Sequence, residues 1–166
     1  LYGSSKLFCE KLLSSWATQR SVDFSILRYG HIYGPGEDQY QKLIPVIIRK
    51  LLNGQPPVVF GDGTVLRDYM YVGDAVKATI NAALIPNIPD PINIVRGRSI
   101  SVKEVVEQLI SLVGSECEIF YHRDKPGGQS FRFDNSYMND CLGKWVQTPL
   151  QTGLSAEVSA LKRSVT

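Results

Sequence analysis

Metal-ligating residues are scarce in this sequence. It contains three cysteines, Cys9, Cys117 and Cys141, and two histidines, His31 and His122. The cysteines are widely separated, and no CxxC pair or Cys/His cluster is present, so the spacing typical of a zinc site is missing. Scattered cysteines of this kind are typical of buried thiols in a reducing compartment. We therefore expect no metal site.

Long apolar runs and an excess of one charge are also missing. No run approaches the roughly 18 apolar residues of a membrane-spanning helix, and no signal peptide is recognisable, so a cytoplasmic protein without a membrane partner is expected. The 18 basic and 16 acidic residues leave a formal net charge of +2. That balance does not indicate a nucleic-acid partner.

Apolar residues are plentiful. Of the 166 residues, 43% are hydrophobic and 20% are charged, which is the composition of one ordinary globular domain with a core. The chain begins at Leu1, in a segment that is typical of a helix entrance, with no strand or turn before it. We therefore expect a piece of a longer protein.

Helical and extended segments alternate along the chain, which predicts an α/β fold. The helix starts are the clearest signals: SVKE at residues 101–104 is a capping box, and Pro45 is expected in the first turn of its helix. The strands are short and their connections irregular, which favours a small lobe attached to a larger sheet. In order, we predict helix 4–19, strand 22–29, helix 41–52, strand 57–60, strand 66–72, helix 74–84, strand 92–95, helix 101–114, strand 117–121, helix 136–142 and a helix starting at 148–149.

The segment YGSSK, residues 2–6, carries the first candidate chemistry. At positions i and i+4 of a helix, Tyr2 and Lys6 share one face, and an ammonium group beside a phenol stabilises the phenolate. Such a tyrosine can act as an acid or base on a sugar hydroxyl, and the lysine can donate to the hydroxyls of a cofactor ribose. The pattern alone is not specific, because YHRDK at 121–125 also matches. The alternative is an exposed first helical turn.

The glycine pair in GDG, residues 61–63, has two readings. A phosphate loop is one, but no lysine follows and no helix begins there. A tight hairpin connection between two strands is therefore expected.

Two further segments follow YGSSK in order: LRYGHIYGPG at residues 27–36 and FGDGTVLRDYMYVGDAV at 60–76. Together the three resemble the extended short-chain dehydrogenase/reductase family. Its nucleotide-sugar epimerases and dehydratases carry YxxxK, RxxNxYGP and GxGxxxRD[FY]x[YH]VxD segments. The resemblance continues through residues 92–94 and 142–150, so it covers nearly the whole chain.

This resemblance implies roles for residues near the start of the chain. Tyr2 would be the catalytic acid and base. Lys6 would assist it and bind the nicotinamide ribose of NAD, so that both residues serve catalysis and cofactor binding. The backbone of Tyr29, Gly30 and His31 would lie beside the nicotinamide.

The resemblance also implies contacts to a nucleotide-diphosphate sugar. Arg67 matches the family arginine that contacts the diphosphate, a role that suits a planar guanidinium because it can donate two hydrogen bonds to phosphate oxygens. Arg132 lies where the family often has a second nucleotide contact. His31 replaces an Asn whose amide can contact the substrate, and the charge of an imidazole varies near neutral pH. Asp68 and Asp74 are expected to organise the turn and cap the following helix.

For the domains, the resemblance implies that residues 1–35 are the last helix–strand portion of an incomplete Rossmann-like domain. Residues 36–166 would mainly form the substrate-binding lobe, with about 66–95 returning to the Rossmann-like sheet. The glycine-rich GxxGxxG loop that binds the NAD phosphates in the family is absent from the chain. We therefore expect NAD to be bound mainly by a missing N-terminal half and the piece alone to be inactive. A homodimer is expected, because family members usually pair through the YxxxK helix.

The implied function is that of an NAD-dependent epimerase or dehydratase acting on a nucleotide-diphosphate sugar, similar to UDP-glucose 4-epimerase. Two alternatives stay open. One is an NADP-dependent keto-sugar or carbonyl reductase of the same fold, because the residue that selects the cofactor lies upstream. The other is a non-catalytic nucleotide-sugar-binding or scaffold protein, which His31 favours and which the intact Tyr2, Lys6 and Arg67 disfavour.

Overall fold

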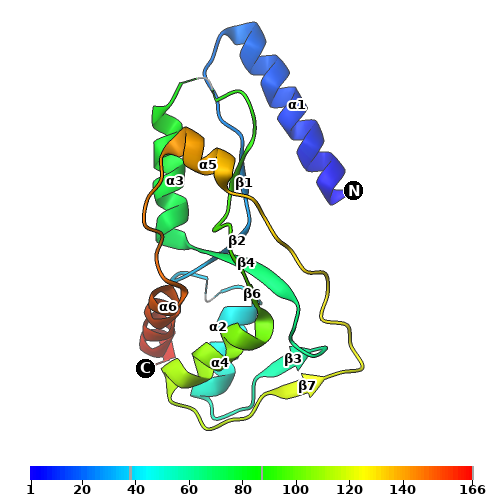
Figure 1. Cartoon of the computed structure of the whole chain (residues 1–166), viewed down its shortest axis with the longest axis vertical. Coiled ribbons are helices and arrows are strands. Elements are labelled where there is room, and N and C mark those ends of the chain that lie inside the picture. The colour runs from blue at the N-terminus through cyan, green and yellow to red at the C-terminus, as the bar shows by residue number, and fades with distance from the viewer. Residues whose placement is uncertain (38, 87, 166) are drawn as a thin grey trace.

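The computed structural model describes residues 1–37, 39–86 and 88–165. Its elements are α1 (Tyr2–Arg20), β1 (Leu27–Tyr29), β2 (His31–Tyr33), α2 (Leu43–Leu52), β3 (Val58–Phe60), β4 (Leu66–Tyr71), α3 (Val72–Leu84), β5 (Ile92–Ile94), β6 (Ser99–Ser101), α4 (Val102–Val113), β7 (Phe120–His122), α5 (Ser136–Leu142) and α6 (Leu150–Val165). The molecule is elongated, with α1 set apart at one end and α2, α4, α6, β3 and β7 gathered at the other (Figure 1). Within the described ranges, no helix is both long and apolar enough to cross a membrane.

The strands form three small sheets of mainly parallel pairs. β1 pairs with β5, β3 pairs with β7, and β4 lies between β2 and β6, antiparallel only to β6. In the β2–β4 pair, His31 is opposite Tyr69. Since side chains alternate along a strand, Arg67, two residues before Tyr69, is on the same face. This register brings His31 and Arg67 together, although 36 positions separate their numbers.

Two apolar clusters stabilise the fold. In α2, buried side chains recur at three- and four-residue spacing and face α4 and α6, so the stripe typical of an amphipathic helix is covered. The second cluster joins α3, β5 and α5. Fully burying one such side chain contributes about 1.5–3 kcal/mol. Central members are Ile44, Ile47, Ile48, Val105, Leu109 and Leu154 in the first cluster, and Met70, Ala78, Ile92, Ile94 and Met138 in the second.

Two buried carboxylates accept hydrogen bonds from segments that are far away in the sequence. Asp68 accepts hydrogen bonds from the backbone N–H groups of residues 96–97, both at 2.8 Å. Asp74 accepts from the Trp145 indole at 3.2 Å and from the Thr148 N–H at 2.8 Å. The expectation that Asp68 and Asp74 cap the next helix is wrong, because the N-cap residue of α3 is Tyr71 and both carboxylates bond to distant segments instead. Both residues connect parts of the chain that are far apart in sequence.

The predicted helices agree well with the structure. Residues 136–142 form α5 with the expected bounds. The capping box before α4 is confirmed, since Ser101 Oγ accepts from the Glu104 N–H at 3.2 Å and the Ser101 N–H donates to Glu104 Oε2 at 3.0 Å. Gly114, with φ 75°, ends that helix in the left-handed conformation.

The strand predictions need correction. The run 22–29 forms a strand only over Leu27–Tyr29, because its partner β5 has only three residues. The last two residues of this strand are exposed. The expected strand 117–121 is shifted to Phe120–His122, and Ser99–Ser101 was missed. The GDG turn is no hairpin connection, since β3 pairs with β7 and not with β4.

Candidate functional site

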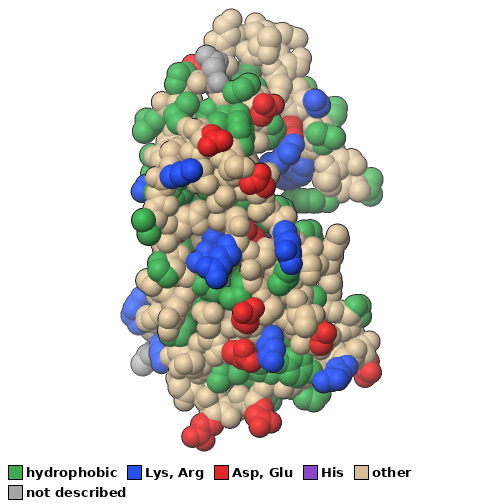
Figure 2. Space-filling view, viewed as in Figure 1, with side chains coloured by type: hydrophobic (Ala, Val, Ile, Leu, Met, Phe, Trp, Pro, Cys, Tyr) green, Lys and Arg blue, Asp and Glu red, His purple; other side chains and the backbone are tan. Residues whose placement is uncertain are grey.

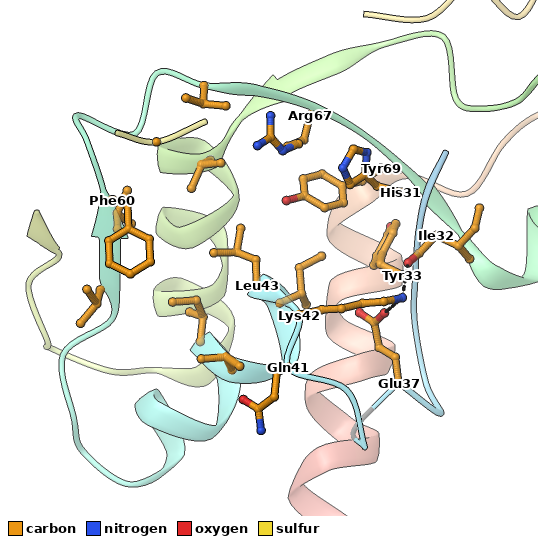
Figure 3. A pocket seen from close by; sticks show the side chains of 18 of the residues that line it. His31, Ile32, Tyr33, Glu37, Gln41, Lys42, Leu43, Phe60, Arg67 and Tyr69 are labelled. Carbon is orange, nitrogen blue, oxygen red and sulfur yellow. Dashed lines mark hydrogen bonds and ion pairs between the residues drawn. The ribbon is translucent and has the colours of Figure 1, made fainter. Parts of the chain in front are cut away.

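A cavity of about 690 Å³ lies between α2, β2, β3 and β4, a size typical of small-molecule sites. Figure 3 shows Phe60 at one end and His31, Arg67 and Tyr69 at the other. The end at β3 is lined by the apolar Val58, Val59 and Phe60, with the Lys125 ammonium 5.4 Å from the centroid of the Phe60 ring. The opposite end contains the imidazole of His31 and the cations of Arg67 and Lys42. The apolar lining residues of the whole cavity include Leu43, Ile44, Ile47, Val58, Val59 and Val102, and the charged ones are Lys42, Lys50, Arg67 and Glu37.

Arg67 is fixed by its own surroundings. Its Nη1 donates to the carbonyl of Leu66 at 3.0 Å and to the carbonyl of Gln129. Its guanidinium lies 5.3 Å from the ring centroid of Phe131, a favourable cation–π arrangement. The other N–H groups have no hydrogen-bond partner in the described part of the chain. Arg67 therefore presents unused donors at the cavity while its position is held.

His31 lies at the same end of the cavity. Its ring centroid is 5.9 Å from that of Tyr69 and 5.8 Å from that of Phe131. Burial lowers the pKa of His31 below 6.5, and the nearby charges of Arg67 and Lys42 lower it further. Its Nδ1 atom is buried and has no hydrogen-bond partner among residues 1–37, 39–86 and 88–165. A buried polar atom without a partner has lost its hydrogen bond to water and has gained none in the protein.

A third group at this end was missed by the sequence reasoning. The Lys42 ammonium donates to Glu37 Oε2 at 2.8 Å and to the Ile32 carbonyl at 3.3 Å. Beside Glu37 lies Glu157 of α6, which is 1% exposed. Burial, together with the Glu37 carboxylate, raises the pKa of Glu157 to about 8, so its carboxyl group is neutral at pH 7. No sequence motif marks a single glutamate in a helix for this role.

Tyr2 and Lys6 line a different hollow, of about 490 Å³, between α1 and residues 25–29. The Lys6 ammonium is 5.5 Å from the centroid of the Tyr2 ring, so the predicted shared helix face is confirmed. Tyr29 also lines this hollow, and its hydroxyl is 2.7 Å from that of Thr79. Figure 2 shows a notch beneath the projecting N-terminal end of α1.

The predicted site residues thus divide into two groups joined by one backbone segment. Tyr29 lines the hollow beside α1, whereas Gly30 and His31, the next two residues, line the larger cavity. At Gly30 the chain passes so close to Val95 that an added Cβ would be 2.9 Å from its Cγ1. Arg132 is exposed and lines neither space.

Comparison with known proteins adds the following likenesses. A sequence model described as the NAD dependent epimerase/dehydratase family matches residues 1–94, more than half of the chain. A UDP-glucose 4-epimerase of Mycolicibacterium smegmatis is 27% identical over 160 residues, which cover 95% of this chain and 51% of that protein. The chain spans about half the length of the curated relatives it matches.

Two solved structures share the fold closely. A UDP-glucose 4-epimerase from Thermotoga maritima, solved with UDP-glucose, superposes with a TM-score of 0.89 at 27% identity, covering 99% of this chain and 54% of that one. A UDP-glucuronic acid 4-epimerase from Bacillus cereus, in complex with UDP-glucuronic acid and NAD, gives a TM-score of 0.83 at 27% identity, covering 98% and 52%. The predicted α/β fold, part of a Rossmann-like protein, is confirmed.

Proposed function

Because the chain belongs to the NAD-dependent epimerase/dehydratase family, we propose that the whole protein converts a nucleotide-diphosphate sugar and that this chain provides the substrate-binding lobe. The observation that carries the proposal is the division of the cavity: one end is apolar, and the other has Arg67 and Lys42 beside His31. A nucleotide-diphosphate sugar has the same division, with a flat base and an anionic diphosphate. UDP-sugars are the first candidates, because both solved relatives contain one.

In this proposal the diphosphate lies at the Arg67 end. The unused N–H groups of Arg67 meet phosphate oxygens, as the planar fork of a guanidinium does well. Its bonds to Leu66 and Gln129 and its contact with Phe131 preorganise it, so less ordering is needed when the ligand arrives. The base occupies the apolar end beside Phe60. Arg132, which lines neither space, is not assigned a ligand contact.

We assign the acid–base step to Tyr2 and Lys6. Tyr2 would take the proton from a sugar hydroxyl. The ammonium of Lys6 lies on the same helix face, 5.5 Å from the centroid of the Tyr2 ring. The hollow that they share with Tyr29 fits the ribose of NAD, because an ammonium and two phenols offer hydrogen bonds to its hydroxyls. Gly30 and His31 would place the backbone beside the nicotinamide. Bound NAD supplies the hydride chemistry, and its phosphates would be held by the rest of the protein.

The first helix supports two further parts of the proposal. Phe8, Leu12 and Trp16 form one row on α1 at four-residue spacing and are 67%, 59% and 49% exposed. Leu7 and Leu13, which are 51% and 39% exposed, lie on either side of this row. We propose that one side of α1 packs on the remainder of the cofactor domain, to which residues 1–35 belong. The other side would pair with a second copy in a homodimer. Burial of such surface is the main driving force for association.

Thermal stability of the chain with a panel of UDP-, dTDP-, GDP- and CDP-sugars tests the proposal. A ligand at about 100 times its Kd adds roughly 2.7 kcal/mol to the free energy of unfolding. We expect the shift with UDP-sugars, its loss in Arg67→Ala and its retention in Arg132→Ala. Arg67→Lys, which keeps the charge without the planar fork, should retain part of it. An unchanged shift in Arg67→Ala would contradict the assignment, as would a chain that responds to none of the panel.

A further inference from the structure

His31 has a ring nitrogen without a hydrogen-bond partner in the described part of the chain and lies near cations that oppose its protonation. Its buried Nδ1 has no hydrogen-bond partner among the described residues. The ring nevertheless lies near two cations, Arg67 and Lys42, that oppose its protonation. Neither the packing of the imidazole between Tyr69 and Phe131 nor the β2–β4 register satisfies that nitrogen.

The groups around the His31 ring come from three segments, two of which contribute charged side chains. β4 contributes Arg67 and the phenol of Tyr69. The segment before α2 contributes Lys42, which is paired with Glu37, and the strap at residues 127–131 contributes the apolar ring of Phe131. The ion pair of Glu37 and Lys42, at 2.8 Å, offsets part of both charges, and Arg67 has the larger effect of the two cations on the ring. The field at the imidazole is therefore dominated by cations, and the neutral ring is favoured.

An anion in the cavity reverses this balance. Diphosphate oxygens beside Arg67 and Lys42 compensate both cations and place negative charge next to the imidazole. An opposite charge within about 4–6 Å favours the protonated form of a histidine. A protonated ring donates from both nitrogens, whereas a neutral ring has only one N–H. The protonated ring would then carry the positive charge that balances the ligand's negative charge at this end of the cavity.

We propose that His31 takes up a proton from solvent when a nucleotide diphosphate binds, so that ligand affinity is coupled to pH through this residue. The inference rests on the proposed function for the class of ligand and adds how the site responds to acidity. The RxxNxYGP segment of the family has asparagine at this position. Asparagine does not titrate, so it does not couple ligand binding to proton uptake. The affinity should fall as pH rises above neutrality, by at most about tenfold per pH unit.

Calorimetric titration with UDP-glucose measures the coupling directly. Its diphosphate is esterified at both ends, so it lacks the terminal phosphate ionisation near pH 6 that would release protons of its own. At pH 7, in two buffers of different ionisation enthalpy, the apparent binding enthalpy of the wild-type chain should differ between the buffers and report net proton uptake. His31→Asn should bind with no buffer dependence. His122→Asn, which changes the second of the two histidines, should behave like wild type.

The affinity of the wild-type chain for UDP-glucose can also be measured between pH 6 and pH 8. It should decrease as pH rises. Binding with the same enthalpy in both buffers and a flat pH profile would overturn the proton coupling and leave the proposed function intact. Proton uptake that persists in His31→Asn would overturn the assignment to this residue. A chain that does not bind UDP-glucose at all would overturn the proposed function and the coupling with it.

Discussion

The carboxyl group of Glu157, on α6, is buried beside the carboxylate of Glu37, which in turn accepts a hydrogen bond from the Lys42 ammonium at 2.8 Å. One cation faces two carboxyl groups, so the pair keeps one proton at neutral pH. This relationship links α6 to the cavity between α2 and β4, which Glu37 and Lys42 line.

Stability should therefore fall as pH rises. The pKa of Glu157 is raised from 4.5 to about 8, so the unfolded chain loses the proton at a lower pH than the folded chain. The stabilising contribution is complete below about pH 4.5 and is lost as pH rises through about 8, at up to about 1.4 kcal/mol per pH unit. Urea unfolding between pH 5 and pH 9 measures the effect.

Glu157→Gln should flatten this profile, because an amide of similar shape does not titrate. Glu107→Gln is the matched control, since Glu107 is half exposed on α4 and its replacement should leave the slope unchanged. If the Glu157→Gln profile is as steep as that of wild type, another group carries the pH dependence.

Gly153 in α6 should not tolerate alanine. Alanine in a helix interior normally stabilises by about 0.5–1 kcal/mol relative to glycine. Here an added Cβ would overlap the Tyr33 hydroxyl group and come within 2.8 Å of Tyr71. We expect Gly153→Ala to destabilise by about 1–3 kcal/mol. Gly3→Ala in α1, where no atom lies within 4 Å of the added Cβ, should be neutral or stabilising. A stabilised Gly153→Ala variant in thermal unfolding would refute this close approach.

Tyr2→Phe in the whole protein should lower kcat by about 10²- to 10⁴-fold, since that is the usual contribution of a positioned acid–base group. Nucleotide-sugar affinity should change little, because Tyr2 does not line the Arg67 cavity. Tyr121→Phe, at the other YxxxK match, is the control and should retain turnover. The Lys125 ammonium of that match is 5.4 Å from the centroid of the Phe60 ring, so it has a different aromatic neighbour. Wild-type turnover in Tyr2→Phe would remove the acid–base assignment.

Most helix signals were read correctly from the sequence, whereas strand pairing and the two local expectations at Asp74 and at the GDG turn were not. The capping box of α4 and the Tyr2–Lys6 face depend on residues three or four positions apart, so the pattern contains the information. The strand bounds depend on a partner elsewhere in the chain, and both 22–29 and 117–121 were predicted too long or out of position.

In the candidate site, too, the features that depend on distant parts of the chain were not predictable from the sequence. Arg67 and His31 were proposed from the family resemblance, but their shared cavity follows from the β2–β4 register. Glu157 could not be recognised, because its burial against Glu37 arises only when α6 docks. The cofactor contacts assigned to Tyr2, Lys6, Tyr29, Gly30 and His31 stay predictions.

The central claim is that the cavity between α2 and β4 binds a nucleotide-diphosphate sugar. A crystal structure of the chain grown with UDP-glucose tests it most directly. We predict density for the diphosphate within hydrogen-bonding distance of the Arg67 guanidinium and for the uracil in the apolar end beside Phe60. Ligand density confined to the hollow beneath α1, or ligand that leaves Arg67 without a contact, would contradict the account.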